Sequence, residues 1–144
     1  MGNLKGVALP LLFTFFVLHL PFAESNWIIN YHIHVTNDLP LLKSPPNQPN
    51  LFLQCKSKDK DIGERGMVKG QDYTWDTPVN FLRTTLFYCK ARWVGHKTRS
   101  FDAFVAERDE MPCSQNHNSC MWSVRDDGIY FSKNNETWSN LYPW

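Results

Sequence analysis

Residues 85–93 read TLFYCKARW, and the side chains of this stretch alternate between two faces. Every second residue falls on one face, which is largely apolar and carries a cysteine: Thr85, Phe87, Cys89, Ala91 and Trp93. A period of two is typical of a β-strand, because successive side chains of a strand point to opposite sides of its sheet. The stretch therefore predicts a strand with one buried face and with Cys89 in the core.

The same alternation returns at short intervals along the chain. Further strands are expected at residues 27–35, 51–55, 73–76, 101–105 and 120–124. Asp127-Gly128 has the residue types of a tight two-residue turn, so residues 129–131 should return as the second strand of a hairpin. No long segment beyond the first 25 residues keeps a helical period. These features predict an all-β protein, a small antiparallel β-sandwich of about 6–8 strands.

Two segments are predicted to connect strands. Residues 44–50 contain Pro45, Pro46 and Pro49, which fix backbone torsions and lack amide donors. The acidic and basic run from Glu107 to Glu110 is expected to be a solvated loop.

The first 23 residues have the features of a secretory signal peptide. Lys5 precedes an apolar run from Val7 to Leu20, and the small residue Ala23 follows it. This run is shorter than the roughly 18 to 20 residues that a membrane-spanning helix needs. We therefore expect cleavage after residue 23 or 25, no membrane insertion, and a secreted, extracellular protein whose residues 24–144 form a single domain.

The charge of the expected mature chain is close to zero. Without Lys5, 14 basic side chains face 13 or 14 acidic ones, depending on the cleavage site. Because nucleic acids are bound mainly through excess positive charge, a nucleic-acid partner is not expected.

Four cysteines lie in the exported part: Cys55, Cys89, Cys113 and Cys120. In an oxidising compartment this even number predicts two disulfides, whereas the spacing lacks the paired ligands of a structural zinc site. Cys55 and Cys89 both fall on the apolar faces of their strands and can meet in the core. Of the three possible pairings, we therefore favour Cys55 with Cys89 and Cys113 with Cys120, which makes the sandwich disulfide-stabilised.

The sequence lacks a recognisable catalytic pattern. None of its serines lies in a nucleophile-elbow motif, and its cysteines are expected to be oxidised. A pair of carboxylates for glycoside hydrolysis would have to converge in three dimensions from Glu107, Asp109, Glu110, Asp126 and Asp127. Acidic residues in turns are more often simply solvated, so we predict no catalytic residues and no enzymatic activity.

His32 and His34 lie two residues apart on the polar face of one predicted strand. This spacing occurs in metal sites, but without a third nearby ligand a polar sheet face is the favoured interpretation. We expect no metal site and no cofactor.

Asn135-Glu136-Thr137 matches the acceptor pattern for N-glycosylation. In a secreted protein this motif predicts a glycan on Asn135, and its alternative is a simple polar turn.

The run KSKDKD at residues 56–61 directly follows Cys55. Three lysines argue against a calcium loop, and the mixed signs make a poor anion site. A solvated connection is the favoured local structure. Because it is dense in charge and starts next to a core disulfide, Lys58, Asp59, Lys60 and Asp61 are candidates for partner contact.

Several short motifs, in this order, resemble the plant self-incompatibility S-protein homologue family. They are HVTNDL at 34–39, CKSKD at 55–59, YTW at 73–75, TLFYC at 85–89, SFD at 100–102, CMWSV at 120–124 and DGIY at 127–130. The resemblance covers residues 32 to about 131. It implies a disulfide-bonded β-sandwich without known enzymatic activity.

For function, the resemblance implies a secreted plant signalling or recognition protein, an extracellular ligand for a cell-surface receptor. In the founding members of the family the outcome of that recognition is rejection of self pollen. The alternative is a secreted cell-wall carbohydrate-binding module, for which the six tryptophans would offer stacking platforms. Burial of Trp93, Trp122 and Trp138 would remove the main support for that alternative.

Overall fold

The computed structural model describes residues 2, 6, 28–41, 45 and 47–144. Apart from residues 2 and 6, the predicted signal peptide and both cleavage positions lie outside these residues. The elements follow in the order β1 (Asn30–Asn37), β2 (Leu51–Lys56), β3 (Asp61–Met67), β4 (Asp72–Pro78), β5 (Leu86–Trp93), β6 (Thr98–Val105), α1 (Ala106–Ser114), β7 (Ser119–Arg125), β8 (Gly128–Ser132) and β9 (Ser139–Pro143).

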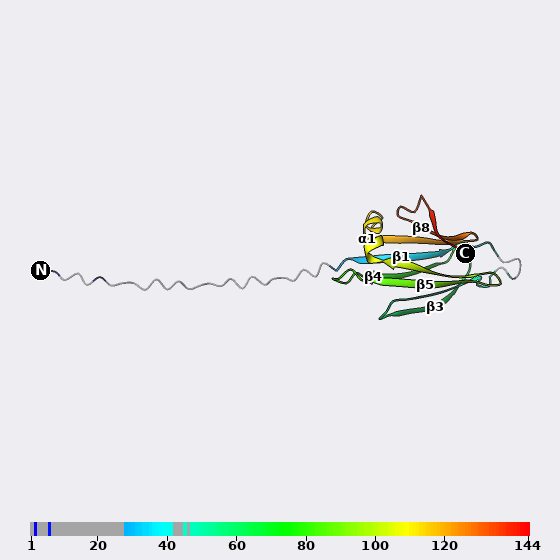
Figure 1. Cartoon of the computed structure of the whole chain (residues 1–144), viewed down its shortest axis with the longest axis horizontal. Helices are drawn as coiled ribbons and strands as arrows, with labels where there is room; N and C mark the ends of the chain where they lie inside the picture. The colour runs from blue at the N-terminus through cyan, green and yellow to red at the C-terminus, as the bar shows by residue number, and fades with distance from the viewer. Residues whose placement is uncertain (1, 3–5, 7–27, 42–44, 46) are drawn as a thin grey trace.

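The strands form two sheets. One has the order β4-β1-β7-β8-β9 and the other β3-β2-β5-β6. Figure 1 shows them as two layers, with α1 at the end where β1 begins. Within the described residues, β1 and β7 form the only parallel pair, and all other neighbours are antiparallel. The predicted all-β sandwich is confirmed.

The core lies between the two sheets. Phe101 of β6 packs against Trp122 of β7 with ring centroids 5.3 Å apart, and Phe87 of β5 packs against Trp75 of β4 at 5.7 Å. The alternation read from residues 85–93 is present in β5, where Phe87, Cys89 and Ala91 are buried. Aromatic pairs of this kind bury large areas, which helps a small sandwich to hold together.

The described residues contain nine strands, where the sequence predicted six to eight. The two that the patterns did not reveal, β3 and β9, both lie at sheet edges. β3 begins at the end of the predicted solvated connection, and its glycines and charged residues give no alternating apolar pattern. An edge strand pairs on one side only, so it needs no apolar face, and exposed charge protects its free edge from aggregation.

Residues 107–110 were predicted to form a loop, and that prediction was wrong. They lie in α1, whose buried residues Ala106, Asp109, Glu110 and Cys113 follow a helical spacing. Two of these four residues are acidic, so their burial gave no apolar signal in the sequence. The helix is also short and contains Pro112, which is unusual inside a helix.

Both disulfides have the pairing favoured from the sequence. Cys55 and Cys89 are bonded as direct cross-strand neighbours of β2 and β5, and both are fully buried. Cys113 is bonded to Cys120 and so fastens the end of α1 to the start of β7. The first bridge therefore staples one sheet, and the second attaches the helix to the other sheet.

Candidate partner-binding surface

Three connections lie near one another at the end of the sandwich where β1 begins. They are the β2–β3 turn (residues 57–60), the β4–β5 loop (residues 79–85) and helix α1 (Figure 1). Shallow cavities join them: one is lined by residues of the turn and of the loop, and others are lined by residues of the loop and of α1. This end is the candidate partner-binding surface.

The predicted contact residues Lys58, Asp59, Lys60 and Asp61 are all exposed there. The segment is a β-hairpin turn rather than a long connection. Ser57 N–H donates to the Lys60 carbonyl at 2.7 Å, and Lys60 N–H donates to Ser57 Oγ at 3.1 Å. These bonds hold the backbone of the turn that carries the four exposed charged residues.

The base of this hairpin contains a disulfide and an irregular strand pairing. The Cys55–Cys89 bridge lies directly below it. Opposite Cys55, the register of β3 shifts at Gly63, whose φ is +97°. A side chain at such a φ is strained, so glycine suits this irregular position.

The β4–β5 loop is held by the side chain of Asn80. Its carbonyl oxygen accepts the Thr84 N–H at 2.8 Å, and its amide donates to Thr84 Oγ1 at 2.7 Å. The Asn80 backbone N–H also donates to Thr85 Oγ1 at 3.0 Å. These contacts close the loop on itself and leave the residues between them at its tip.

Two large apolar residues occupy that tip. Phe81 is 99% exposed and Leu82 is 75% exposed. Other exposed apolar side chains lie beside it: Ile29, which precedes β1, Leu86 at the start of β5, and Met111 in α1. Sequence reasoning missed this feature. The sequence shows only two adjacent large apolar residues, three and four positions after Pro78, which ends a strand, and outside any alternating pattern.

Arg83 connects the loop to the helix. Its guanidinium donates two hydrogen bonds to the carboxylate of Glu110 in α1, one of them from Nε to Oε1 at 3.3 Å. The Glu110 side chain is only 11% exposed, whereas that of Arg83 is 64% exposed. The hydrogen bond to Glu110, followed by the charge of its carboxylate, raises the pKa of the Arg83 guanidinium. The loop and the helix are thus joined by an ion pair.

The cavities of this surface are open grooves. One of them, about 550 Å³, is lined by Ser57, Lys58, Asp59, Asn80, Thr84, Leu86 and Tyr88. Three smaller ones of about 280–300 Å³ all include Arg83 in their walls. The grooves therefore surround the loop tip on the side of the hairpin and on the side of the helix.

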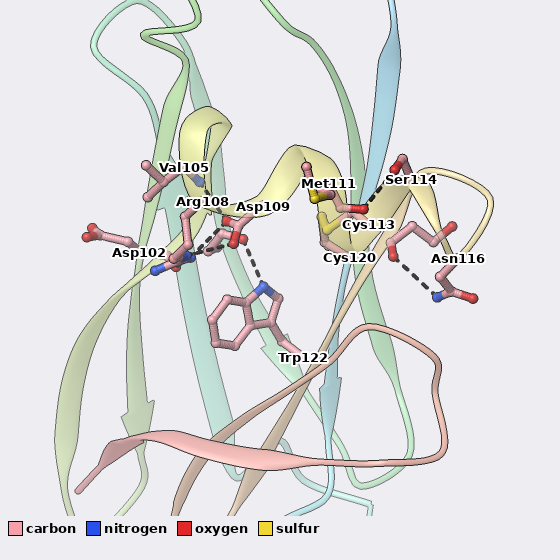
Figure 2. The surroundings of a disulfide bond; sticks show 12 residues. Asp102, Val105, Arg108, Asp109, Met111, Cys113, Ser114, Asn116, Cys120 and Trp122 are labelled. Atoms are coloured by element: carbon pink, nitrogen blue, oxygen red, sulfur yellow. Dashed lines mark hydrogen bonds and ion pairs between the residues drawn. A yellow bond between two sulfur atoms is a disulfide. The ribbon is translucent and has the colours of Figure 1, made fainter.

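Helix α1 is also joined to the core by other side chains (Figure 2). Asp109 is buried; it accepts the Val105 N–H at 2.7 Å and is paired with Arg108, whose Nε lies 2.7 Å away. Trp122 donates its indole N–H to the Ala103 carbonyl at 2.8 Å. Together with the Cys113–Cys120 bridge, these contacts fix the helix that supports Glu110.

The acidic residues considered for catalysis have separate structural roles. Asp109 holds the start of α1, Glu110 is paired with Arg83, and Asp127 accepts a hydrogen bond from the Tyr130 hydroxyl at 2.6 Å. Bonding to Asp127, together with desolvation, raises the pKa of Tyr130. The structure does not bring any two of these three carboxylates together as a catalytic pair.

His32 and His34 each contact a carboxylate of the neighbouring strand β4. His32 Nδ1 lies 2.5 Å from Asp76, and His34 Nδ1 lies 2.8 Å from Asp72. Across the part of the chain that the structure describes, His, Cys, Asp and Glu form no group of three suited to a metal ion. The two histidines are thus engaged in cross-strand pairs.

The tryptophans offer little support for carbohydrate stacking. Trp75 and Trp122 are buried in the core. Trp93 is half-buried and stacks on His96 with centroids 4.0 Å apart, and the half-buried Trp138 lies under the Arg125 guanidinium. None of the tryptophans between residues 28 and 144 is among the exposed large apolar side chains.

Asn135, the predicted glycan acceptor, lies in the turn between β8 and β9 and is exposed. Its φ is +59°, and the side chain of Asn134 accepts the N–H groups of Glu136 and Thr137 at 2.9 and 2.8 Å. The acceptor side chain therefore stands at the tip of a well-formed turn.

The described residues contain no helix that is both long enough and apolar enough to span a bilayer.

Comparison with known proteins gives consistent matches. Residues 32–144 match the family model "Plant self-incompatibility protein S1". The chain is 36% identical over 113 residues to S-protein homolog 29 of Arabidopsis thaliana, covering 78% of this chain and 76% of the relative. It is 31% identical over 94 residues to Self-incompatibility protein S1 of Papaver rhoeas, covering 64% and 66%. No solved structure was found to match.

The family match begins within β1 and reaches the last residue, so it includes both disulfides and the whole candidate surface. The motifs quoted from the sequence also lie within it. This chain belongs to the plant self-incompatibility protein S1 family.

Proposed function

We propose that this chain is a secreted plant protein that acts as an extracellular ligand for a cell-surface receptor. The observation that carries the proposal is the rigid, exposed hairpin turn of Lys58, Asp59, Lys60 and Asp61 above the buried Cys55–Cys89 bridge. Loops held by a rigid scaffold are common binding elements. Membership of the family, together with the similarity to Self-incompatibility protein S1 of Papaver rhoeas, supports a recognition role.

The hairpin is tested by replacing all four charged residues with serine in the full chain. Because the four residues are exposed and outside the core, the variant should fold with an unchanged melting temperature. Binding of the labelled protein to intact plant cells should weaken. A control variant, Asp126→Ser with Lys133→Ser, removes one charge of each sign from exposed positions, where the hairpin variant removes two of each, and should bind as the wild type does. Equal binding by the hairpin variant would make the turn a solubilising element only.

Secretion is tested at the N-terminus of the protein recovered from the medium of plant cells. The proposed cleavage gives a chain that starts at Glu24 or at Asn26. A protein that retains Met1, or that stays inside the cells, would contradict the proposal.

We also propose that Asn135 carries an N-linked glycan. The exposed turn supports it, because the glycosylation machinery needs an accessible acceptor. Endoglycosidase treatment should shift the mass of the secreted wild type and leave Asn135→Gln unchanged. A wild-type mass equal to that of the bare polypeptide would exclude the modification.

The biological setting of the ligand is decided by expression. Restriction to the pistil would support a role in rejection of self pollen, whereas expression in root or leaf would assign the ligand to another signalling process. Messenger RNA measured by cell type distinguishes the two.

A further inference from the structure

Phe81 and Leu82 together form the most exposed apolar feature of the described chain. Phe81 has 99% of its surface in contact with solvent, and Leu82 has 75%. Single exposed apolar residues are ordinary, but two adjacent large ones at a protruding tip keep a substantial apolar area in water. Neither side chain is among those that form or pack against the core. The stability of the fold therefore does not explain why these two side chains are exposed.

The tip is fixed before any partner arrives. The hydrogen bonds of Asn80 to Thr84 and Thr85 close the loop, and Arg83 adopts a φ of +56° while paired with Glu110. A left-handed φ is unusual for arginine and shows that this backbone is held in a defined conformation. Since binding loses affinity when a loop must first be ordered, such a loop presents its tip at a reduced entropic cost.

The surroundings of the tip have the composition of a protein interface. Further exposed apolar side chains, Ile29, Leu86 and Met111, belong to the adjoining elements. The charged hairpin borders the tip across the groove that Lys58, Asp59 and Thr84 line. Protein interfaces have an apolar centre in which aromatic residues carry much of the binding energy, and a polar rim around it.

The charged residues around the Phe81-Leu82 tip indicate which class of partner fits. Along the hairpin they alternate in sign from Lys58 to Asp61, and Glu107 adds a carboxylate beside the loop. An anionic bilayer or an acidic polymer attracts cations and repels these carboxylates. A protein surface can complement both signs at once.

We infer that Phe81 and Leu82 insert into an apolar pocket on the ectodomain of the receptor protein, whose rim carries charges of both signs that face the Lys58–Asp61 hairpin. This inference rests on the proposed ligand function and names the part of the chain that makes the central contact. The hairpin then sets the orientation of the complex, and the Phe81-Leu82 tip supplies most of its affinity.

The experiment compares full-length secreted chains that differ at the tip. Phe81→Ser with Leu82→Ser removes the apolar surface, and Phe81→Leu with Leu82→Met retains it. Leu141→Ser is the matched control, because Leu141 is 45% exposed on the edge strand β9 and does not belong to the tip. Labelled proteins are titrated onto intact plant cells and onto neutral and anionic phospholipid vesicles, at low and at physiological salt.

The double serine variant should bind cells at least about tenfold more weakly than the wild type, the range expected for loss of interface hot spots. Leu141→Ser should stay within about threefold, the small effect usual for residues outside a hot spot, and the Leu-Met variant, which keeps the apolar surface but loses the aromatic ring, should bind more tightly than the double serine variant. All variants should have native circular dichroism. Protease treatment of the cells should abolish wild-type binding, and none of the proteins should bind the vesicles.

Different outcomes separate the two proposals. Saturable wild-type binding that the double serine variant retains would overturn the tip contact and leave the ligand function standing. Absence of saturable wild-type binding to any cell type would overturn both. Vesicle binding lost in the double serine variant would make the tip a lipid contact instead. Wild-type self-association in sedimentation that this variant abolishes would make it a contact between copies of the chain.

Discussion

Arg83 of the β4–β5 loop and Glu110 of α1 form a two-pronged ion pair between elements that are 27 residues apart in the sequence. The pair joins the loop to a helix that is itself fastened by the Cys113–Cys120 bridge. The exposed tip is thus connected through side chains to a covalent link in the core. Loss of this pair should therefore change the loop more than the fold.

Replacing Glu110 with glutamine tests that relationship. The change keeps the shape of the side chain and removes its charge, so the bond from Arg83 weakens. We expect a small decrease in the melting temperature and faster amide hydrogen exchange in residues 80–84. Glu107→Gln, on the exposed side of the same helix turn, serves as control and should change neither quantity. Unchanged exchange in the Glu110 variant would show that Asn80 alone holds the loop.

The two disulfides should differ in their contributions to stability. They close loops of 34 and 7 residues in the unfolded chain. In the chain-entropy model, loss of Cys55–Cys89 costs about 4 kcal/mol and loss of Cys113–Cys120 about 2.5 kcal/mol. One variant replaces Cys55 and Cys89 with alanine, and the other replaces Cys113 and Cys120 with serine. Urea unfolding of each variant measures the loss in the free energy of unfolding. A larger loss from the shorter loop would mean that the fit of α1 matters more than loop entropy.

Asn37 should be among the polar residues most important for stability. It is fully buried at the end of β1, and its amide donates to Asn50 Oδ1 at 2.7 Å and to the Met67 carbonyl at 2.9 Å. Its side-chain carbonyl oxygen, Oδ1, accepts the Leu39 N–H at 3.0 Å. Asn37→Ala leaves several of these groups unpaired, so we expect a loss of about 2–4 kcal/mol in the free energy of unfolding.

The control for Asn37 is Gln48→Ala, an exposed residue of the connection that Asn37 helps to hold. Its effect should stay within about 0.5 kcal/mol. Similar small losses in both variants would show that water replaces the buried contacts of Asn37.

Tyr73 should make the protein less stable at alkaline pH. Burial first, and the charge of Asp61 second, raise the pKa of Tyr73 above its usual value of 10.0. The folded state therefore favours the protonated phenol. Its contribution to stability is complete below pH 10.0 and is lost as the pH rises through the higher pKa of the folded state.

Urea unfolding of the wild type and of Tyr73→Phe, followed from about one pH unit below to one above the ordinary tyrosine pKa, measures this contribution. The variant should start less stable, because the Tyr73 hydroxyl donates to the Gly63 carbonyl at 2.7 Å. Its stability should then fall less steeply with pH. Part of the slope should remain, since burial also raises the pKa of Tyr31. Parallel slopes would contradict the role of Tyr73.

The sequence by itself predicted seven of the nine strands in the described residues and favoured the disulfide pairing that is present. Alternation is a local property, so the period of two in residues 85–93 and in β1 was sufficient to place strands with a buried face. The same alternation placed Cys55 and Cys89 in the core, where they are bonded. Segments without an apolar face, β3 and β9, carried no such signal, because an edge strand is held by backbone pairing on one side.

Only the tertiary structure decided the candidate surface. The charges at 58–61 were visible in the sequence, but the proximity of the hairpin, the Phe81-Leu82 tip and α1 depends on how two sheets pack. The helix itself was hidden because two of its buried residues, Asp109 and Glu110, are acidic and lie inward only since Arg108 and Arg83 neutralise them. Exposure of Phe81 and Leu82 is likewise a property of the folded chain, since apolar residues in the sequence do not reveal which of them the core leaves in water.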